Sequence, residues 1–176
     1  MISSFFCWLQ RIAFSRWFWL ALLVLGVSML AVALGYQYLL DEPPCVLCIH
    51  VRLWVSLMVL FAALGVWLHE SPRLNSMIHL FMLLIGAGLA DRSYQLLGTE
   101  RGFIFGDCVF DLGFPSWLAI DQWFPAFYGV ETACGYTPVL LFGITMAEAL
   151  IVMSALLIIV SLLLLLASFK APDQAA

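Results

Sequence analysis

Residues 143–169 read GITMAEALIVMSALLIIVSLLLLLASF and contain a single charged residue, Glu148. About 20 helical residues are needed to cross the roughly 30 Å hydrocarbon core of a bilayer. This stretch is long and apolar enough to do so, and residues 17–36, 49–68 and 75–94 have the same character. The sequence therefore predicts an all-α membrane protein in which four transmembrane helices form a bundle.

The composition of the whole chain agrees with this expectation. Of its 176 residues, 65% are hydrophobic and 10% are charged, and the mean hydropathy is +1.08. A soluble domain of this length needs far more polar surface. We expect one membrane domain over residues 1–176, and the absence of a basic patch argues against nucleic acid as a partner.

The first apolar stretch has an alternative interpretation as a cleaved signal peptide. Arg11 and Arg16 give it a positive start, and Ala31-Val32-Ala33 resembles a cleavage site. The apolar run is longer than a usual signal core, however, and three further spans follow it. We therefore expect it to remain as a transmembrane helix.

The distribution of basic residues predicts the orientation of the spans. Basic side chains occur before the first span, between the second and third, and after the fourth: Arg11, Arg16, Arg73 and Lys170. The other two connections, about residues 37–48 and 95–142, are mainly acidic. Because Lys and Arg accumulate in cytoplasmic loops, both termini are expected in the cytoplasm and these two loops outside it.

This orientation sorts the five cysteines. Cys45 and Cys48 fall on the outer side in the first loop, Cys108 and Cys134 in the second, and Cys7 alone on the inner side. Outside the cytosol, cysteine pairs favour disulfide chemistry.

Cys45 and Cys48 form a CxxC motif directly after Pro43 and Pro44. Proline suits a helix start but cannot continue a preceding helix, so the motif is expected on the first turn of the second span. Unpaired N–H groups and the positive end of the helix dipole favour an anion there, which predicts a lowered cysteine pKa and a reactive thiolate. Arg52 lies one turn further on the same face as Cys48, where an arginine is expected to be paired or functional.

Less specific interpretations of this motif remain open. CxxC could be half of a zinc site, although His50 is the only histidine of the outer side that could complete it. It could be a structural disulfide, although tight CxxC bridges tend to be redox-active. Arg52 could reach lipid headgroups instead of serving a site. We favour a redox-active pair with a functional arginine.

Cys108 and Cys134 are 26 positions apart in one long loop. A structural staple is the simplest interpretation. Loops of this length are commonly functional, however, and two disulfides that face one compartment can exchange with each other. The sequence favours exchange between the two pairs.

Residues 114–125, FPSWLAIDQWFP, lie between these two cysteines. At 100° per residue, the large side chains of this segment share one face, and they are Trp117, Ile120, Trp123 and Phe124. This pattern predicts a short interfacial helix that lies on the membrane near the CxxC motif. An ordinary loop aromatic cluster is the alternative.

With these elements, the chain resembles the bacterial disulfide bond formation protein B (DsbB) family over essentially its full length. The resemblance rests on P-C-V-L-C-I-x-x-R at Pro44 to Arg52, on the pair Cys108 and Cys134, and on F-P-x-W-L-x-I-D-x-W-x-P at residues 114–125. Four spans with both termini inside match the family as well.

The resemblance implies a thiol:quinone oxidoreductase of the bacterial inner membrane whose redox cysteines face the periplasm. A reduced periplasmic DsbA-like thiol oxidase would attack the Cys108–Cys134 disulfide at Cys108. Cys134 would then attack Cys45 of the Cys45–Cys48 bridge. Cys48 would be released beside ubiquinone or menaquinone and would reduce it, with Arg52 assisting the quinone step.

One departure from the family concerns the quinone site. Members commonly carry a histidine near the end of the third span, whereas residues 93–97, SYQLL, contain none. His50 could replace it, and Arg92 is a further candidate quinone contact. Interfacial anchoring is the default interpretation of Asp91 and Arg92, which we expect in the final turn of that span. Cys7 matches no pair and is expected to be a reduced, non-essential thiol.

Three other functions compete with this one. A vitamin K epoxide reductase-like enzyme is also a small helical bundle with a CxxC motif, but there the loop pair precedes the CxxC, whereas here the CxxC comes first. A non-enzymatic scaffold with two structural disulfides would form no mixed disulfide and bind no quinone. A paralogue dedicated to one client would share every motif, so the sequence does not separate it from a general oxidase.

Overall fold

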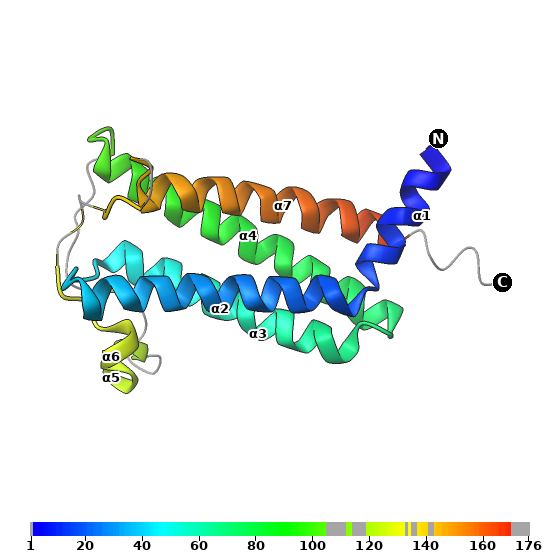
Figure 1. Cartoon of the computed structure of the whole chain (residues 1–176), viewed down its shortest axis with the longest axis horizontal. Helices are drawn as coiled ribbons and strands as arrows, with labels where there is room; N and C mark the ends of the chain where they lie inside the picture. The colour runs from blue at the N-terminus through cyan, green and yellow to red at the C-terminus, as the bar shows by residue number, and fades with distance from the viewer. Residues whose placement is uncertain are drawn as a thin grey trace.

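The computed structural model describes residues 2–104, 112–113, 119–132, 134, 137–140 and 143–169. Four long helices run along one another in a bundle: α2 (Arg16–Leu39), α3 (Val46–Leu68), α4 (Pro72–Glu100) and α7 (Met146–Phe169) (Figure 1). All four are long and apolar enough to cross a membrane. The prediction of a four-span helical membrane protein is confirmed, and no strand occurs within the described ranges.

Local capping signals set the starts of the last two spans. Ser71 precedes α4, and Pro72 occupies its first turn, so the helix begins three residues before the predicted start. At α7, the Glu148 carboxylate accepts the Thr145 N–H at 3.1 Å, and the Glu148 N–H donates to the Thr145 hydroxyl at 3.4 Å. This reciprocal pair is a capping box, and it makes α7 begin at Met146.

The third span is longer than the sequence predicted. It continues to Glu100 and ends where Gly102 adopts a left-handed conformation with φ of +73°. The Gly102 N–H then donates to the Thr99 carbonyl at 3.3 Å, which closes the helix. Asp91 and Arg92 therefore lie about two turns before the helix end, and their predicted place in its final turn is wrong.

A further helix, α1 (Ile2–Ala13), precedes the spans and was not predicted. Its buried side chains Leu9 and Ala13 pack with Leu164 and Ala167 at the end of α7. The Gln10 side-chain amide also donates to the Ala167 carbonyl at 3.3 Å. The start of α1 and the end of α7 consequently lie at the same end of the bundle (Figure 1).

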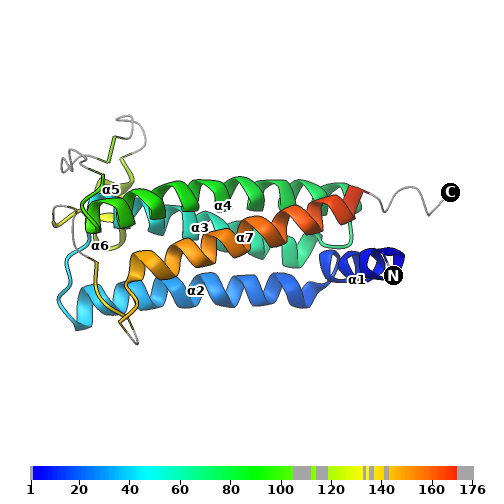
Figure 2. The ribbon, with the colours of Figure 1, turned by 90° about the horizontal axis from the view of Figure 1, so that it is seen from above.

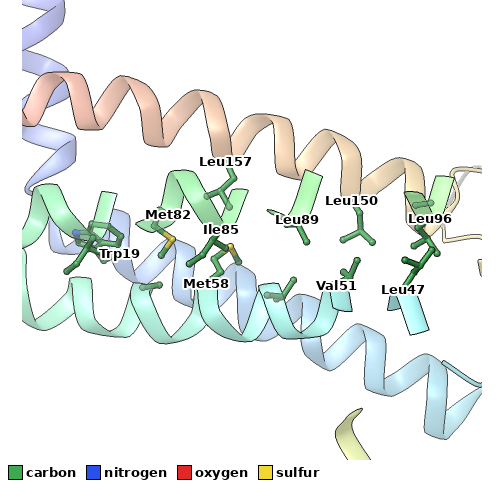
Figure 3. Close-up of a cluster of buried hydrophobic side chains, with 14 of the residues drawn as sticks. Trp19, Leu47, Val51, Met58, Met82, Ile85, Leu89, Leu96, Leu150 and Leu157 are labelled. Carbon is green, nitrogen blue, oxygen red and sulfur yellow. The ribbon is translucent and has the colours of Figure 1, made fainter. Parts of the chain in front are cut away.

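Large apolar side chains from all four spans fill the bundle interior. Figure 3 shows Met58 of α3, Met82 and Ile85 of α4, and Leu157 of α7 meeting near its middle. Helices α4 and α7 pack against each other, and Figure 2 shows α7 running obliquely to α4. At the end of the bundle near α1, the buried Trp19 of α2 closes this core.

Polar groups fix Trp19 at that end. Its indole N–H donates to the Asn75 side chain at 3.2 Å, and the Asn75 amide donates to the carbonyl of Ala13 at 2.9 Å. The His79 ring lies 4.7 Å from the Trp19 ring, measured between centroids. This cluster ties α1, α2 and α4 together at the end of the bundle opposite the CxxC motif (Figure 1).

The described part of the long loop contains two single-turn helices, α5 (Ile120–Trp123) and α6 (Pro125–Tyr128). The predicted interfacial helix over residues 114–125 is described only from residue 119 onward, so its first half, with Trp117, lies outside the described residues. Within the described half, the helix is interrupted at Phe124, and Pro125 starts a second turn. Trp123 and Phe124 are exposed, and the location of this segment on a membrane surface stays a prediction.

Candidate functional site: a dithiol beside an apolar cavity

The CxxC motif occupies the start of α3, as predicted. Cys45 caps the helix, and its sulfur accepts the Cys48 N–H at 3.3 Å. The two sulfur atoms are 2.8 Å apart. Cys45 is almost completely buried, with an exposed fraction of 1%, while Cys48 is partly accessible. The two sulfurs therefore differ in accessibility, and only that of Cys48 can be reached from the surroundings.

The expectation of a lowered pKa at this helix start is wrong for Cys45. With both thiols reduced, its pKa is raised from 9.0 to about 12. A hydrogen bond with Cys134 lowers this value, but the hydrogen bond with Cys48, burial and the charge of Cys48 together raise it by more. When one of two thiols in contact ionises, the two sulfurs share the remaining proton, and at the buried sulfur the protonated form is favoured. Cys45 therefore retains its proton in the reduced pair.

Cys134 of the long loop lies against Cys45, since the two side chains are hydrogen-bonded. The backbone explains this approach. The Pro44 carbonyl accepts the N–H groups of Glu131 and Thr132 at 3.0 and 3.3 Å, and Cys45 and Thr132 form an isolated parallel bridge. The structure thus brings together one cysteine of each predicted pair.

An apolar cavity of about 320 Å³ opens beside the dithiol. Its walls are mainly apolar side chains of α2, α3 and α7, such as Met29, Val51 and Leu150. Cys48 and Arg52 also line it. A cavity of this size with a few placed polar groups is typical of small-molecule sites, and it places a thiol and a guanidinium on one wall.

The Arg52 side chain is buried and donates three hydrogen bonds to polar partners. One terminal nitrogen donates to the Gln37 side-chain oxygen at 2.6 Å and to the Phe127 carbonyl at 3.1 Å, and the other donates to the Ala33 carbonyl at 3.1 Å. Its exposed fraction is 6%. The arginine is therefore held inside the protein instead of reaching lipid headgroups, which the sequence left open.

Several residues of this site were missed by the sequence analysis. Gln37, which is buried, donates its side-chain amide to the Glu131 carboxylate at 3.2 Å. The Tyr128 hydroxyl lies 2.8 Å from the Ser56 hydroxyl. A signal was available for Gln37, because a polar side chain in the last turn of an apolar span usually has a specific partner.

The two remaining predicted quinone contacts, His50 and Arg92, are not among the residues that line the cavity. The two ring nitrogens of His50 lie 3.0 Å from the Val46 carbonyl and 3.1 Å from the Leu112 carbonyl. Arg92 donates to Gln95 at 3.2 Å and pairs with Asp91. These contacts connect His50 to the long loop and give Arg92 partners on its own helix.

Two cysteines lie outside this constellation. Cys108 falls outside the described residues, so the predicted Cys108–Cys134 pairing is untested. Cys7 is exposed on α1, at the end of the bundle opposite the CxxC motif (Figure 1).

Comparison with known proteins shows the family of this chain. Residues 15–164 match the family model described as disulfide bond formation protein DsbB. The chain belongs to the DsbB family. It is 32% identical to disulfide bond formation protein B of Shewanella loihica over 148 residues, which cover 82% of this chain and 85% of the relative. It is also 32% identical to disulfide bond formation protein B 2 of Pseudomonas aeruginosa over 135 residues, which cover 76% and 80%.

Family membership supports a membrane protein that acts in disulfide bond formation. The four spans are those of a multi-pass membrane protein. The match also decides against the vitamin K epoxide reductase-like interpretation, in agreement with the order of the cysteine pairs along the chain.

Proposed function

We propose that this protein is a thiol:quinone oxidoreductase of the bacterial inner membrane that reoxidises a periplasmic DsbA-like dithiol protein. One observation carries the proposal: Cys134 is hydrogen-bonded to Cys45, whose CxxC partner Cys48 lines an apolar cavity together with Arg52. A loop thiol, a second dithiol and a small-molecule cavity thus follow one another in space, as an electron relay requires.

The first steps are disulfide exchanges, which conserve electrons at each transfer. A partner thiolate attacks Cys108 of the Cys108–Cys134 disulfide and releases Cys134 as a thiolate. Cys134 attacks Cys45 of the Cys45–Cys48 disulfide, and Cys48 leaves with the electron pair. The second thiol of the partner then resolves the mixed disulfide at Cys108, and Cys108 takes Cys134 back from Cys45. The partner ends oxidised, and Cys45 and Cys48 end as a dithiol.

The geometry around Cys45 supports this direction of attack. Its sulfur is buried and holds its proton when reduced, whereas Cys48 faces the cavity. Cys45 is therefore suited to be the sulfur that receives attack, and Cys48 to be the leaving thiolate. The Arg52 guanidinium, four residues further along α3, favours negative charge at this wall of the cavity.

The residues of the cavity fit a quinone. Its apolar walls suit a hydrocarbon ring and tail, and Arg52 supplies a hydrogen-bond donor for a carbonyl oxygen. When bound, ubiquinone or menaquinone would accept two electrons and two protons from the Cys45–Cys48 dithiol and restore its disulfide. We assign this site to Cys48 and Arg52, and leave His50 and Arg92 as weaker candidates because neither lines the cavity.

The orientation follows from the same proposal. The dithiols face the periplasm, and both termini lie in the cytoplasm, as the arginine distribution predicts. A periplasm kept oxidising by a DsbA–DsbB–quinone chain is an established general case. The start of α1 and the end of α7 lie at one end of the bundle and the CxxC motif at the other (Figure 1), which is compatible with this orientation.

Quinone reduction by purified protein tests the proposal. The full chain is mixed with a reduced DsbA-like partner and ubiquinone, and quinone absorbance is followed. We expect turnover in the native protein and its loss when any of the four redox cysteines is replaced by alanine: Cys45, Cys48, Cys108 and Cys134. Cys7→Ala is the matched control and should retain near-native turnover.

Two results would count against specific parts of the proposal. A Cys108→Ala protein that oxidises the partner at the native rate would break the order of the relay. For the quinone site, we expect Arg52→His to raise the apparent KM for ubiquinone, and an unchanged KM would remove Arg52 from that site. A non-enzymatic scaffold would give neither turnover nor trapped mixed disulfide, and a dedicated paralogue would turn over with one client only.

A further inference from the structure

The segment that precedes Cys134 is held against α2 and α3 by contacts that the proposed relay does not explain. We call residues 125–132 the docking segment. Its backbone carbonyls accept a hydrogen bond from the Tyr38 hydroxyl at Ala126 and from the Arg52 guanidinium at Phe127. Two side chains of the segment make further contacts, Tyr128 with Ser56 and Glu131 with Gln37. The backbone N–H groups of Glu131 and Thr132 donate to the Pro44 carbonyl.

These contacts determine where the sulfur of Cys134 can lie. Two residues of extended chain reach at most about 7 Å. Because Thr132 is bridged to Cys45, Cys134 is confined to the neighbourhood of that cysteine. Release of the docking segment would leave Cys134 on a long loop, where its encounter with Cys45 would depend on loop closure.

Gln37 is the centre of this arrangement. Its side-chain oxygen accepts from Arg52 at 2.6 Å, while its side-chain nitrogen donates to Glu131 at 3.2 Å. A side-chain amide is neutral, and it can accept from a cation with its oxygen while it donates to a carboxylate with its nitrogen. Gln37 and Arg52 are both buried, so their contact is made where competing water is scarce. The contact between Gln37 and the exposed Glu131 is partly buried.

We propose that Arg52, Gln37 and Glu131 form a clamp that positions Cys134 on Cys45, so that Arg52 serves the disulfide exchange as well as the cavity. The inference rests on the proposed relay and adds positioning residues to it. Electrons move in this step as described above: the Cys134–Cys45 bond forms, the Cys45–Cys48 bond breaks, and Cys48 leaves with the electron pair. The clamp takes no part in bond making and acts on geometry alone.

Two substitutions separate the clamp from the cavity. Gln37→Glu keeps an acceptor for Arg52 but removes the donor to Glu131 and places two carboxylates together. Glu131→Ala removes the acceptor on the docking segment, but it removes no hydrogen-bond partner of Arg52 and no residue that lines the cavity. The double exchange Gln37→Glu with Glu131→Gln restores the contact with donor and acceptor reversed and conserves the total charge.

The readout is the rate at which Cys45 and Cys134 join. In the full chain carrying Cys48→Ala and Cys108→Ala, the azo oxidant diamide takes two electrons and two protons from Cys45 and Cys134, which leaves a disulfide and the hydrazine. Alkylation and mass spectrometry then measure the disulfide over time. This assay contains neither a protein partner nor a quinone, so its outcome is independent of turnover.

We expect Gln37→Glu and Glu131→Ala each to slow disulfide formation about ten-fold, the effect of one lost charge-assisted hydrogen bond. The double exchange should return the rate to within about three-fold of the parent, since it recreates such a bond. Glu70→Gln, an exposed glutamate between α3 and α4, is the matched control and should not change the rate. In the turnover assay, Glu131→Ala should lower the rate with an unchanged apparent KM for ubiquinone.

Three results would overturn the clamp: no disulfide in the parent, equal rates in parent and single variants, or a double exchange as slow as the single ones. If the native protein showed no quinone turnover while the disulfide rates were as expected, the proposed function would be overturned and the clamp would stand.

Discussion

Replacement of Gly65 by alanine probes the packing of α2 on α3 at one well-defined contact. A Cβ atom at position 65 would lie 2.3 Å from Cδ2 and 2.5 Å from Cε3 of the Trp19 indole. Ordinary carbon–carbon contacts are about 3.5–4.0 Å. The indole would therefore have to move by about 1 Å to accept a single methyl group.

That movement is opposed on every side. Trp19 has an exposed fraction of 0%, its N–H donates to Asn75, and its ring packs against His79. Overpacking of a buried site destabilises by about 1–3 kcal/mol, and a lost hydrogen bond adds about 0.5–1.5 kcal/mol. The better helix propensity of alanine returns about 1 kcal/mol. We expect Gly65→Ala to lower the free energy of unfolding by about 2 kcal/mol.

Unfolding in mixed micelles with increasing mole fraction of SDS, followed by circular dichroism, measures this change. Gly35→Ala is the matched control, because an added Cβ there meets no atom within 4 Å. That variant should be as stable as the native protein or slightly more so. If Gly65→Ala unfolded at the same SDS fraction as Gly35→Ala, the close contact between Trp19 and α3 would be refuted.

Three further predictions concern the thiols and the docking segment. Because the pKa of Cys45 is about 12 against an ordinary 9.0, its thiolate fraction at pH 8 is about a thousand-fold below that of an ordinary thiol. The rate at which iodoacetamide alkylates Cys45 in the reduced protein, measured at that residue by mass spectrometry, should therefore rise ten-fold per pH unit up to about pH 12, and a plateau near pH 9 would contradict this. Tyr128→Phe removes the bond to Ser56 and should slow Cys45–Cys134 disulfide formation by about two- to five-fold; a native rate would show that this contact does not help docking. Cys7→Ser should leave the free energy of unfolding within about 0.5 kcal/mol of the native value, as expected for an exposed side chain, and a larger loss would show that the thiol packs against other groups.

The spans were predictable because hydropathy over about 20 residues responds to the lipid environment alone. Their ends depend on single residues and were less accurate. Gly102 ends α4 and the Thr145–Glu148 capping box starts α7, and both signals are visible in the sequence once a cap is sought. Helix α1 was missed because its apolar side chains form one stripe instead of a continuous run. No apolar stretch in it is long enough to suggest a span.

The site was predictable only where local sequence determines it. Two prolines followed by a CxxC motif define the start of α3, and four-residue spacing puts Cys48 and Arg52 on one wall. The partners of Arg52 come from Gln37 on another helix and from Phe127, 75 positions away, so no local pattern indicates them. The raised pKa of Cys45 could not be predicted from the sequence either, because this pKa depends on the contacts and burial of the thiol in the folded chain.

The contact between α1 and the end of α7 joins the two extremes of the chain. Leu9 and Ala13 find their packing partners, Leu164 and Ala167, only after about 155 later residues have been synthesised and inserted. Until then, the first helix exposes an unsatisfied apolar stripe. Helix α1 can therefore pack only when the last span is complete. A chain that stops short of residue 164 should leave α1 accessible to protease.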